Sequence, residues 1–265
     1  MTDSPEYLSK LNTHVPHSAR VWNYWLGGKD NFAADRAVGD KVLEVYPDVA
    51  TVARASRAFL ARAVRFLAGE AGIRQFLDLG TGLPTANNTH EVAQAIAPDA
   101  RVVYVDNDPL VLVHARALLT SSADGRTDYI DADVRDIEKI LAAADGTLDF
   151  TRPIALMMLG ILGNLPDADG PAAIVDRFVS AVPSGSYLVI NDSTGTAEVV
   201  AEAVRTAGDA GVDYHLRTPE QIAGFFQGLE MVEPGVVSTP LWRPEPDPAG
   251  PPAALNVFCG VGRKP

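Results

Sequence analysis

The chain has little of several features that define particular classes of protein. Its 265 residues include one cysteine, Cys259, which excludes an intramolecular disulfide and a cysteine-based zinc site and favours a cytoplasmic location. The longest apolar run, residues 154–163, is too short to cross a bilayer. The N-terminus has no basic segment followed by an apolar one, so we expect neither a signal peptide nor a membrane partner.

Positive charge is also scarce. The chain has 22 Lys and Arg residues against 34 Asp and Glu residues, which gives a formal net charge of −12. A negatively charged protein repels phosphate backbones, so we expect no nucleic-acid partner. The arginines of residues 54–65 fall at helical spacing opposite an apolar stripe, a pattern typical of a solvated helix face.

The apolar residues that are present, 47% of the chain, change their pattern near residue 70. Short bounded apolar runs predict strands, and helix-like stretches separate most of them. Strands alternating with helices predict a mostly parallel sheet covered by helices on both faces. We expect strands at 76–80, 102–106, 154–159 and 187–191 with a weaker one near Tyr129, and helices at 85–96, 109–119, 137–144 and 171–182.

Both ends of the chain differ from this alternation. Residues 231–237 and 254–262 form strand-like runs with a proline-rich loop and no helix between them, which predicts a terminal antiparallel strand pair. Helical spacing before the sheet predicts helices at 18–26, 33–45 and 49–68. We therefore predict one α/β domain over 1–265: a helical cap over 1–69 and a Rossmann-like core with a seven-stranded sheet over 70–265.

The strongest candidate site is FLDLGTGLPT, residues 76–85, in which a strand runs into a glycine-rich turn and then a helix. Gly80 and Gly82 allow a tight turn and a close approach of the backbone to a ligand beyond the carboxyl ends of the strands. A dinucleotide fingerprint needs a third glycine where this chain has Thr85, so an NAD(P)-dependent oxidoreductase stays only as an alternative.

Acidic residues follow the next two expected strands. Asp106 ends VVYVD, where a carboxylate can accept two hydrogen bonds from a ribose diol. In IDADVRD, Asp133 is placed to accept from an adenine amino group, and the Val134 amide can donate to a ring nitrogen. The alternative is that the acidic residues of IDADVRD only cap the helix that follows.

The order FLDLGTG, VVYVDND, IDADVRD and then an apolar strand resembles the class I S-adenosylmethionine-dependent methyltransferases. Residues 19–36, 89–94 and 104–119 extend the resemblance, over nearly the whole chain, to the actinobacterial S-adenosyl methyltransferase family, formerly a domain of unknown function. The resemblance implies S-adenosylmethionine as cofactor, S-adenosylhomocysteine as product, and in-line methyl transfer to a small-molecule acceptor. A non-catalytic sensor of S-adenosylmethionine stays as a second alternative.

We expect the cofactor to contact the three motifs, the end of the fourth strand and the N-terminal segment. The candidate cofactor-binding residues are Tyr24, Lys29, Asn31, Asp78, Gly80, Thr81, Gly82, Asp106, Asn107, Asp133, Val134 and Leu159.

Residues 20–36 are expected to form a lid over the cofactor. Trp22, Trp25 and Leu26 would pack on the body, while the polar residues near Gly27 and Gly28 would face the cofactor. The alternative is that the aromatic residues only complete the core and that Lys29 is solvated.

No catalytic residue or metal site is predicted. Relatives often carry a histidine and an aromatic residue after the fourth strand, where this chain has Gly163 and Asn164. His14 and His17 have no third ligand nearby. The sequence names neither the acceptor nor an oligomeric state.

Overall fold

The computed structural model describes residues 11–118, 121–248 and 250–265, and among them an eight-stranded sheet forms the centre of the molecule. The strand order is β3-β2-β1-β4-β5-β8-β6, and β7 also pairs with β8. Neighbours among the first five strands are parallel, which confirms the predicted fold class. These strands are β1 (Gln75–Leu79), β2 (Arg101–Asp106), β3 (Arg126–Asp131), β4 (Ala155–Leu159) and β5 (Tyr187–Ser193).

The structure has one strand more than the seven predicted, and the additional strand lies among the antiparallel strands at the end of the chain. β8 (Val257–Arg263) runs antiparallel to β5. The run over 231–237 forms two short strands, β6 (Glu230–Met231) and β7 (Val237–Ser238), rather than one. Gly235 lies between them in the left-handed region, with φ +84°, and donates to the Val232 carbonyl. This turn divides the run, and both pieces pair with β8.

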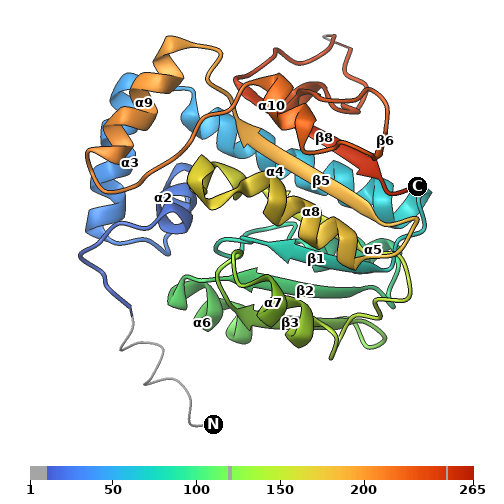
Figure 1. Cartoon of the computed structure of the whole chain (residues 1–265). Helices are drawn as coiled ribbons and strands as arrows, with labels where there is room; N and C mark the ends of the chain where they lie inside the picture. Colours follow the sequence, from blue (N-terminus) through green and yellow to red (C-terminus); the bar gives the residue numbers. More distant parts are fainter. Residues whose placement is uncertain (1–10, 119–120, 249) are drawn as a thin grey trace.

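Helices cover both faces of the sheet, as Figure 1 shows. α7 (Ile137–Ala144), α8 (Pro171–Ala181) and α10 (Pro219–Gly224) pack on one face, and α4 (Val49–Arg65) and α5 (Thr89–Ile96) pack on the other. Every residue of β1 is buried, as expected for a strand with helices on both sides. The remaining short elements are α6 (Pro109–Leu118), a π-turn after α4 (Phe66–Glu70) and 3₁₀ turns at Leu162–Asn164, Asp167–Asp169 and Thr239–Leu241.

A cap of three helices lies beyond the carboxyl ends of the parallel strands (Figure 1). It consists of α2 (Ser18–Trp25), α3 (Ala33–Val45) and α9 (Glu198–Gly208). Buried side chains such as Val21, Val42 and Val200 join the three helices in one apolar cluster. The N-terminal segment therefore does not form the cap alone, because α9 completes it and α4 packs along the sheet.

Candidate functional site

A cavity of about 290 Å³ lies between the cap and the carboxyl ends of the strands. Part of its lining, here called the strand-end floor, comes from β1, β2, β4 and the turns after β1, β2 and β3: Asp78, Gly80, Thr81, Gly82, Asp106, Asn107, Asp133, Val134 and Leu159. Another part, here called the apolar chamber, comes from the cap, its loops and α4: Val21, Trp22, Trp25, Leu26, Val42, Tyr46, Val49, Val52, Val200, Ala203, Val204, Ala207 and Val212. The structure thus brings together every predicted site residue from Asp78 onward.

The glycine-rich turn after β1 is fixed by backbone geometry. Gly80 and Gly82 have φ of +69° and +67°, a region that side chains rarely tolerate. The Gly80 and Thr81 amides both donate to the Val105 carbonyl, which holds the turn against β2. A Cβ at Gly82 would meet no protein atom within 4 Å, so the turn faces open space in the cavity.

The predicted helix after this turn starts later than expected, at Thr89 instead of Thr85. Asn88 is its N-cap: the Asn88 amide donates to Glu91 Oε2 at 2.8 Å, and the Asn88 side chain bonds the Thr85 backbone. A polar loop therefore separates the glycine-rich turn from α5.

Asp106 is buried at the end of β2. Its Oδ2 accepts the Gly82 amide at 2.8 Å, and its Oδ1 accepts the Asp108 amide at 2.9 Å. Burial raises the pKa of this carboxyl, while the two amides oppose the rise. Each carboxylate oxygen accepts about two hydrogen bonds, so each retains one acceptor position for a ligand.

Asp78 and Arg57 place opposite charges side by side in the cavity lining. Burial raises the pKa of Asp78 to about 6, although the Thr89 hydroxyl donates to it at 2.6 Å and the Arg57 charge lowers it. Arg57 comes from α4, and its Nη2 is held by the carbonyls of Ala86 and Asn87 at 3.3 and 3.2 Å. Its Nε is buried without a hydrogen-bond partner among the described residues. The helical spacing of the arginines in α4 predicted a solvated face, so this cation was not expected in the site.

The Asp133 carboxylate is already occupied by donors from the protein. Oδ1 accepts the amide and Nε of Arg135, at 2.9 and 2.7 Å. Oδ2 accepts Arg135 Nη2 at 2.7 Å and Asn107 Nδ2 at 3.3 Å. The hydrogen bonds from Arg135 hold the pKa of Asp133 below its usual value. An adenine amino group would have to replace one of these donors, and the long Asn107 contact is the weakest of them.

The three predicted residues of the N-terminal segment lie elsewhere. None of Tyr24, Lys29 and Asn31 is among the described residues that line the cavity. The Tyr24 hydroxyl donates to Asp40, Asn31 is buried and donates to Asn23 and to the Gly28 carbonyl, and Lys29 is exposed. The cap does cover the cavity, but it does so with Trp22, Trp25 and Leu26, which were expected to pack on the body. Helical spacing identified this apolar face without indicating what it would contact.

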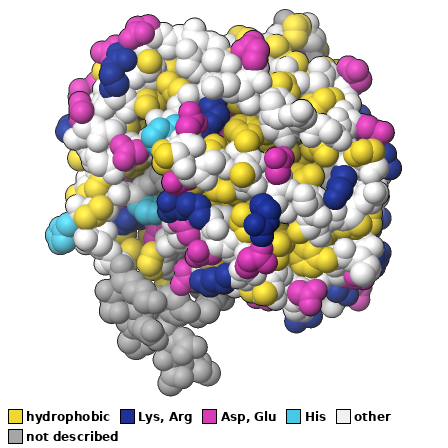
Figure 2. Space-filling model, in the orientation of Figure 1, with side chains coloured by type: hydrophobic (Ala, Val, Ile, Leu, Met, Phe, Trp, Pro, Cys, Tyr) yellow, Lys and Arg dark blue, Asp and Glu magenta, His cyan; other side chains and the backbone are white. Residues whose placement is uncertain are grey.

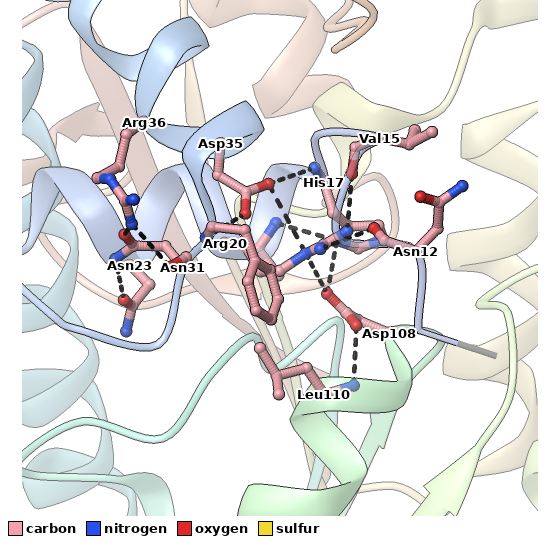
Figure 3. Close-up of polar contacts among 12 residues, drawn as sticks. Asn12, Val15, His17, Arg20, Asn23, Asn31, Asp35, Arg36, Asp108 and Leu110 are labelled. Atoms are coloured by element: carbon pink, nitrogen blue, oxygen red, sulfur yellow. Dashed lines mark hydrogen bonds and ion pairs between the residues drawn. The ribbon is translucent and has the colours of Figure 1, made fainter. Parts of the chain in front are cut away.

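A group of polar residues, three of them buried and charged, joins the cap to the loop after β2 and is here called the cap anchor (Figure 3). It consists of His17 and Arg20 at the start of α2, Asp35 in α3 and Asp108 two residues beyond Asp106. Asp108 Oδ2 lies 3.1 Å from His17 Nδ1 and 3.2 Å from Arg20 Nε, and the His17 amide donates to Asp35 at 2.9 Å. His17 therefore lies against the same carboxylate that pairs with Arg20.

Tyr214, which no sequence pattern predicted at the site, occupies the place opposite Gly163. It lies in the loop after α9, and a Cβ at Gly163 would overlap its ring. Its hydroxyl donates to Asp192 Oδ1 at the end of β5 and accepts the Ser193 amide at 3.1 Å. Burial raises the pKa of Asp192 to about 6. A tyrosine from a distant loop thus supplies an aromatic hydroxyl where relatives were expected to carry a histidine and an aromatic residue.

The model of the S-adenosyl methyltransferase family matches residues 5–265 of the chain. The chain belongs to this family. It superposes with a TM-score of 0.92 on a crystal structure of a DUF574 family protein from Streptomyces avermitilis, at 43% identity over 96% of this chain and 99% of that one. A proposed methyltransferase from Thermobifida fusca gives a TM-score of 0.87 at 44% identity, over 100% of this chain and 99% of that one.

More distant proteins share either the fold alone or sequence similarity over only part of the chain. Human N-acetylserotonin methyltransferase in complex with S-adenosylmethionine has 11% identity and a TM-score of 0.51, over 97% of this chain and 65% of that one. Argininosuccinate lyase from Neisseria gonorrhoeae is 28% identical over 152 residues, 57% of this chain, and the chain spans about a third (32%) of that protein.

The family and the fold confirm that this is an S-adenosylmethionine-dependent methyltransferase with S-adenosylmethionine as its cofactor. No helix in the described part of the chain is long and apolar enough to cross a membrane.

Proposed function

We propose that this methyltransferase acts on a small-molecule acceptor enclosed in the same cavity as the cofactor. The observation that carries the proposal is the continuity of one cavity from the glycine-rich turn into the apolar chamber. When bound, S-adenosylmethionine supplies an already activated methyl group, so the protein mainly has to align the acceptor and exclude water.

The strand-end floor fits the cofactor at three points. Gly82 leaves open space beside the turn, and Asp106 retains acceptor positions for a ribose diol. Val134 lies beside Asp133 at the cavity wall, where its amide can meet an adenine ring nitrogen. These residues, with Asp78, Thr81 and Leu159, are our proposed cofactor site, and Asn107 lines it as the donor to Asp133 that an adenine amino group would replace.

A cation for the cofactor's carboxylate is provided by Arg57 in this proposal. Its guanidinium is fixed by the loop between the glycine-rich turn and α5 and lines the cavity, whereas Lys29 is exposed outside it. Guanidinium groups suit carboxylates because they offer two parallel donors. We assign to Arg57 the contact with the cofactor's carboxylate that the sequence predicted for Lys29.

Charge also favours a small acceptor over a nucleic acid. The chain carries a net charge of −12, and on the face shown in Figure 2 the Lys and Arg side chains lie among Asp and Glu side chains. An interspersed surface of this kind does not provide the continuous basic track that a phosphate backbone requires.

The test follows a labelled methyl group. The protein is incubated with methyl-labelled S-adenosylmethionine and, separately, with the small-molecule, protein and nucleic-acid fractions of a cell extract. We expect label only in the small-molecule fraction, and none with Asp106→Asn. Label in the protein or nucleic-acid fraction would overturn the proposal. Tight binding of S-adenosylhomocysteine with no labelled product in any fraction would favour a sensor.

A further inference from the structure

A second cavity, of about 240 Å³, lies at the amino ends of the parallel strands, on the side of the sheet away from the cap. Its lining comes from the segments that lead into β1, β4 and β5 and from the carboxyl end of β8. In Figure 1 these strand ends lie on the side of the molecule marked C, far from α2 and α3. The cavity shares no lining residue with the one beneath the cap, so it is a separate place for a ligand.

Positive charge collects at this second cavity, although the chain as a whole is acidic. Arg74, Arg152 and Arg263 line it, and no Asp or Glu of the described part of the chain does. The three arginines come from three separate segments, just before β1, just before β4 and at the end of β8. In a chain with a net charge of −12, a concave surface with this local excess of positive charge favours an anionic ligand.

The segments that carry two of the arginines are held in place by hydrogen bonds. Gln75, the first residue of β1, is 3% exposed. Its Nε2 donates to the carbonyls of Asp149 and Arg152 at 2.9 and 3.3 Å, and its Oε1 accepts the Asp149 amide at 2.6 Å. Arg74 Nη1 donates to two backbone carbonyls, at 2.8 and 3.0 Å. The loop before β4 and the Arg74 side chain therefore have defined positions at the cavity.

Two of the arginines have a carboxylate partner outside the cavity lining. Arg74 Nε lies 3.5 Å from Asp99, and Arg263 Nη1 lies 2.9 Å from Glu230. Both carboxylates are largely exposed, and exposed ion pairs contribute little to stability. Within the described residues, Nη2 of Arg74 and both Nε and Nη2 of Arg263 have no hydrogen-bond partner. These N–H groups remain available to a ligand.

Arg152 differs from the other two because its exposed side chain forms no hydrogen bond or ion pair with the described residues. Its charge does act on Asp149, whose pKa is lowered first by hydrogen bonds from Thr151 and to a smaller extent by Arg152. The Asp149 carboxyl is directed to Thr151, which donates to it through its amide at 2.9 Å and through its hydroxyl at 2.6 Å. An anion in the cavity would give the Arg152 guanidinium a direct partner.

We propose that this cavity binds an anion that carries phosphate groups. A tetrahedral phosphate presents oxygens in several directions and can meet guanidinium groups from three segments, whereas a planar carboxylate pairs in its plane with one guanidinium fork. Tyr187 lines the same cavity, with its ring edge to face against Phe66 at 6.1 Å, and provides aromatic surface for an organic part of the ligand. Pyrophosphate and a nucleoside diphosphate share this chemistry. The site is independent of methyl transfer.

The test is calorimetry with pyrophosphate on the full chain, at low ionic strength and with S-adenosylhomocysteine saturating the cavity beneath the cap. We expect one pyrophosphate per chain with a Kd below about 1 mM, weakened by added salt. Arg152→Gln and Arg263→Gln should each weaken binding by about 10-fold or more, the loss of a charge-assisted hydrogen bond. Arg177→Gln is the matched control: it removes an exposed arginine that is paired with Glu138 on a different surface, and it should change nothing.

Two further probes identify the anion. Citrate carries a similar charge on carboxylates and should bind at least about 10-fold more weakly than pyrophosphate. ADP that binds as tightly as pyrophosphate indicates that the phosphates alone are recognised, whereas tighter binding that Tyr187→Leu abolishes indicates a nucleotide.

Three results would overturn the proposal: no saturable binding of pyrophosphate, citrate binding as tightly as pyrophosphate, or an equal loss of affinity in Arg152→Gln and Arg177→Gln. Unchanged affinity for S-adenosylhomocysteine shows that each arginine variant is folded. Because Arg152 and Arg263 are both exposed, either variant alone can decide the outcome.

Discussion

Apolar side chains fill both faces of the sheet, whereas the junction between the cap and the sheet contains buried charged residues. β1 is buried at every position among other hydrophobic residues. In the cap anchor, Arg20, Asp35 and Asp108 are 4%, 0% and 1% exposed. Apolar contacts tolerate small shifts, but a buried charge must keep its partner, since an unpaired charge is very costly. The cap therefore has one defined position over the cavity.

The largest effect is expected from breaking the cap anchor. Asp108→Ala leaves the buried Arg20 guanidinium without one of its two carboxylates and removes the partner of His17. We expect the free energy of unfolding, measured by urea denaturation, to fall by about 3–5 kcal/mol. The control is Glu198→Gln, which removes an ion pair with Arg205 between exposed side chains and should have no measurable effect. Equal stabilities for the two variants would contradict the contrast.

The pattern of apolar residues predicted the sheet better than the cap, because the strands follow from local signals along the chain. β1, its glycine-rich turn and Asp106 follow from local signals: a bounded apolar run, residues that permit positive φ, and an acidic residue at a strand end. The chain order then brings them to one edge of a parallel sheet. They are among the predicted residues that line the cavity.

The missed residues depend on contacts between distant segments. α9 follows a strand but precedes a long irregular loop, so nothing local relates it to α3. Tyr214 enters the site because Gly163, about fifty residues away, leaves room for its ring. Only packing reveals such a pair. In the same way, the periodicity of α2 identified an apolar face, but the position of the cap anchor decides that this face covers the cavity.

The second prediction concerns the buried carboxyl group of Asp192. Burial raises the pKa of Asp192 to about 6 from its usual 3.8. The folded state then holds the proton more tightly than the unfolded state, so this stabilising contribution is complete below pH 4 and is lost as the pH rises through 6. We expect Asp192 to lower the free energy of unfolding by about 3 kcal/mol between pH 4 and pH 7.

Unfolding of the wild type and of Asp192→Asn across this range measures the effect. The variant should show a smaller loss of stability with rising pH, with Asp78 responsible for part of what remains, since its pKa is also raised to about 6. Asp176→Asn, at an exposed position on α8, is the control and should follow the wild type. If the variant loses as much stability with rising pH as the wild type does, Asp192 is not responsible for the loss.

The third prediction compares how Arg57 of α4 and Lys29 of the N-terminal segment affect the affinity for the cofactor product. Arg57→Met should weaken S-adenosylhomocysteine by about 10- to 100-fold in calorimetry, the loss of one charge-assisted hydrogen bond. Lys29→Met should change nothing, because Lys29 is exposed and lies outside the cavity lining. Weaker binding in Lys29→Met with unchanged binding in Arg57→Met would place the cofactor's carboxylate at the N-terminal segment. That result would favour the lid predicted from the sequence.

The smallest effect is expected at Asn107, on the strand-end floor. Its amide lies 3.3 Å from Asp133 Oδ2, the longest of the four hydrogen bonds that the carboxylate accepts. If an adenine amino group takes this position, Asn107→Ala removes a competitor, and the affinity for S-adenosylhomocysteine should stay the same or rise by at most about 3-fold. If Asn107 instead contacts the cofactor directly, the affinity should fall by about 10-fold. Calorimetry on Asn107→Ala therefore distinguishes a residue that only positions Asp133 from one that binds the cofactor. The substitution leaves the net charge unchanged and should have little effect on the stability of the fold.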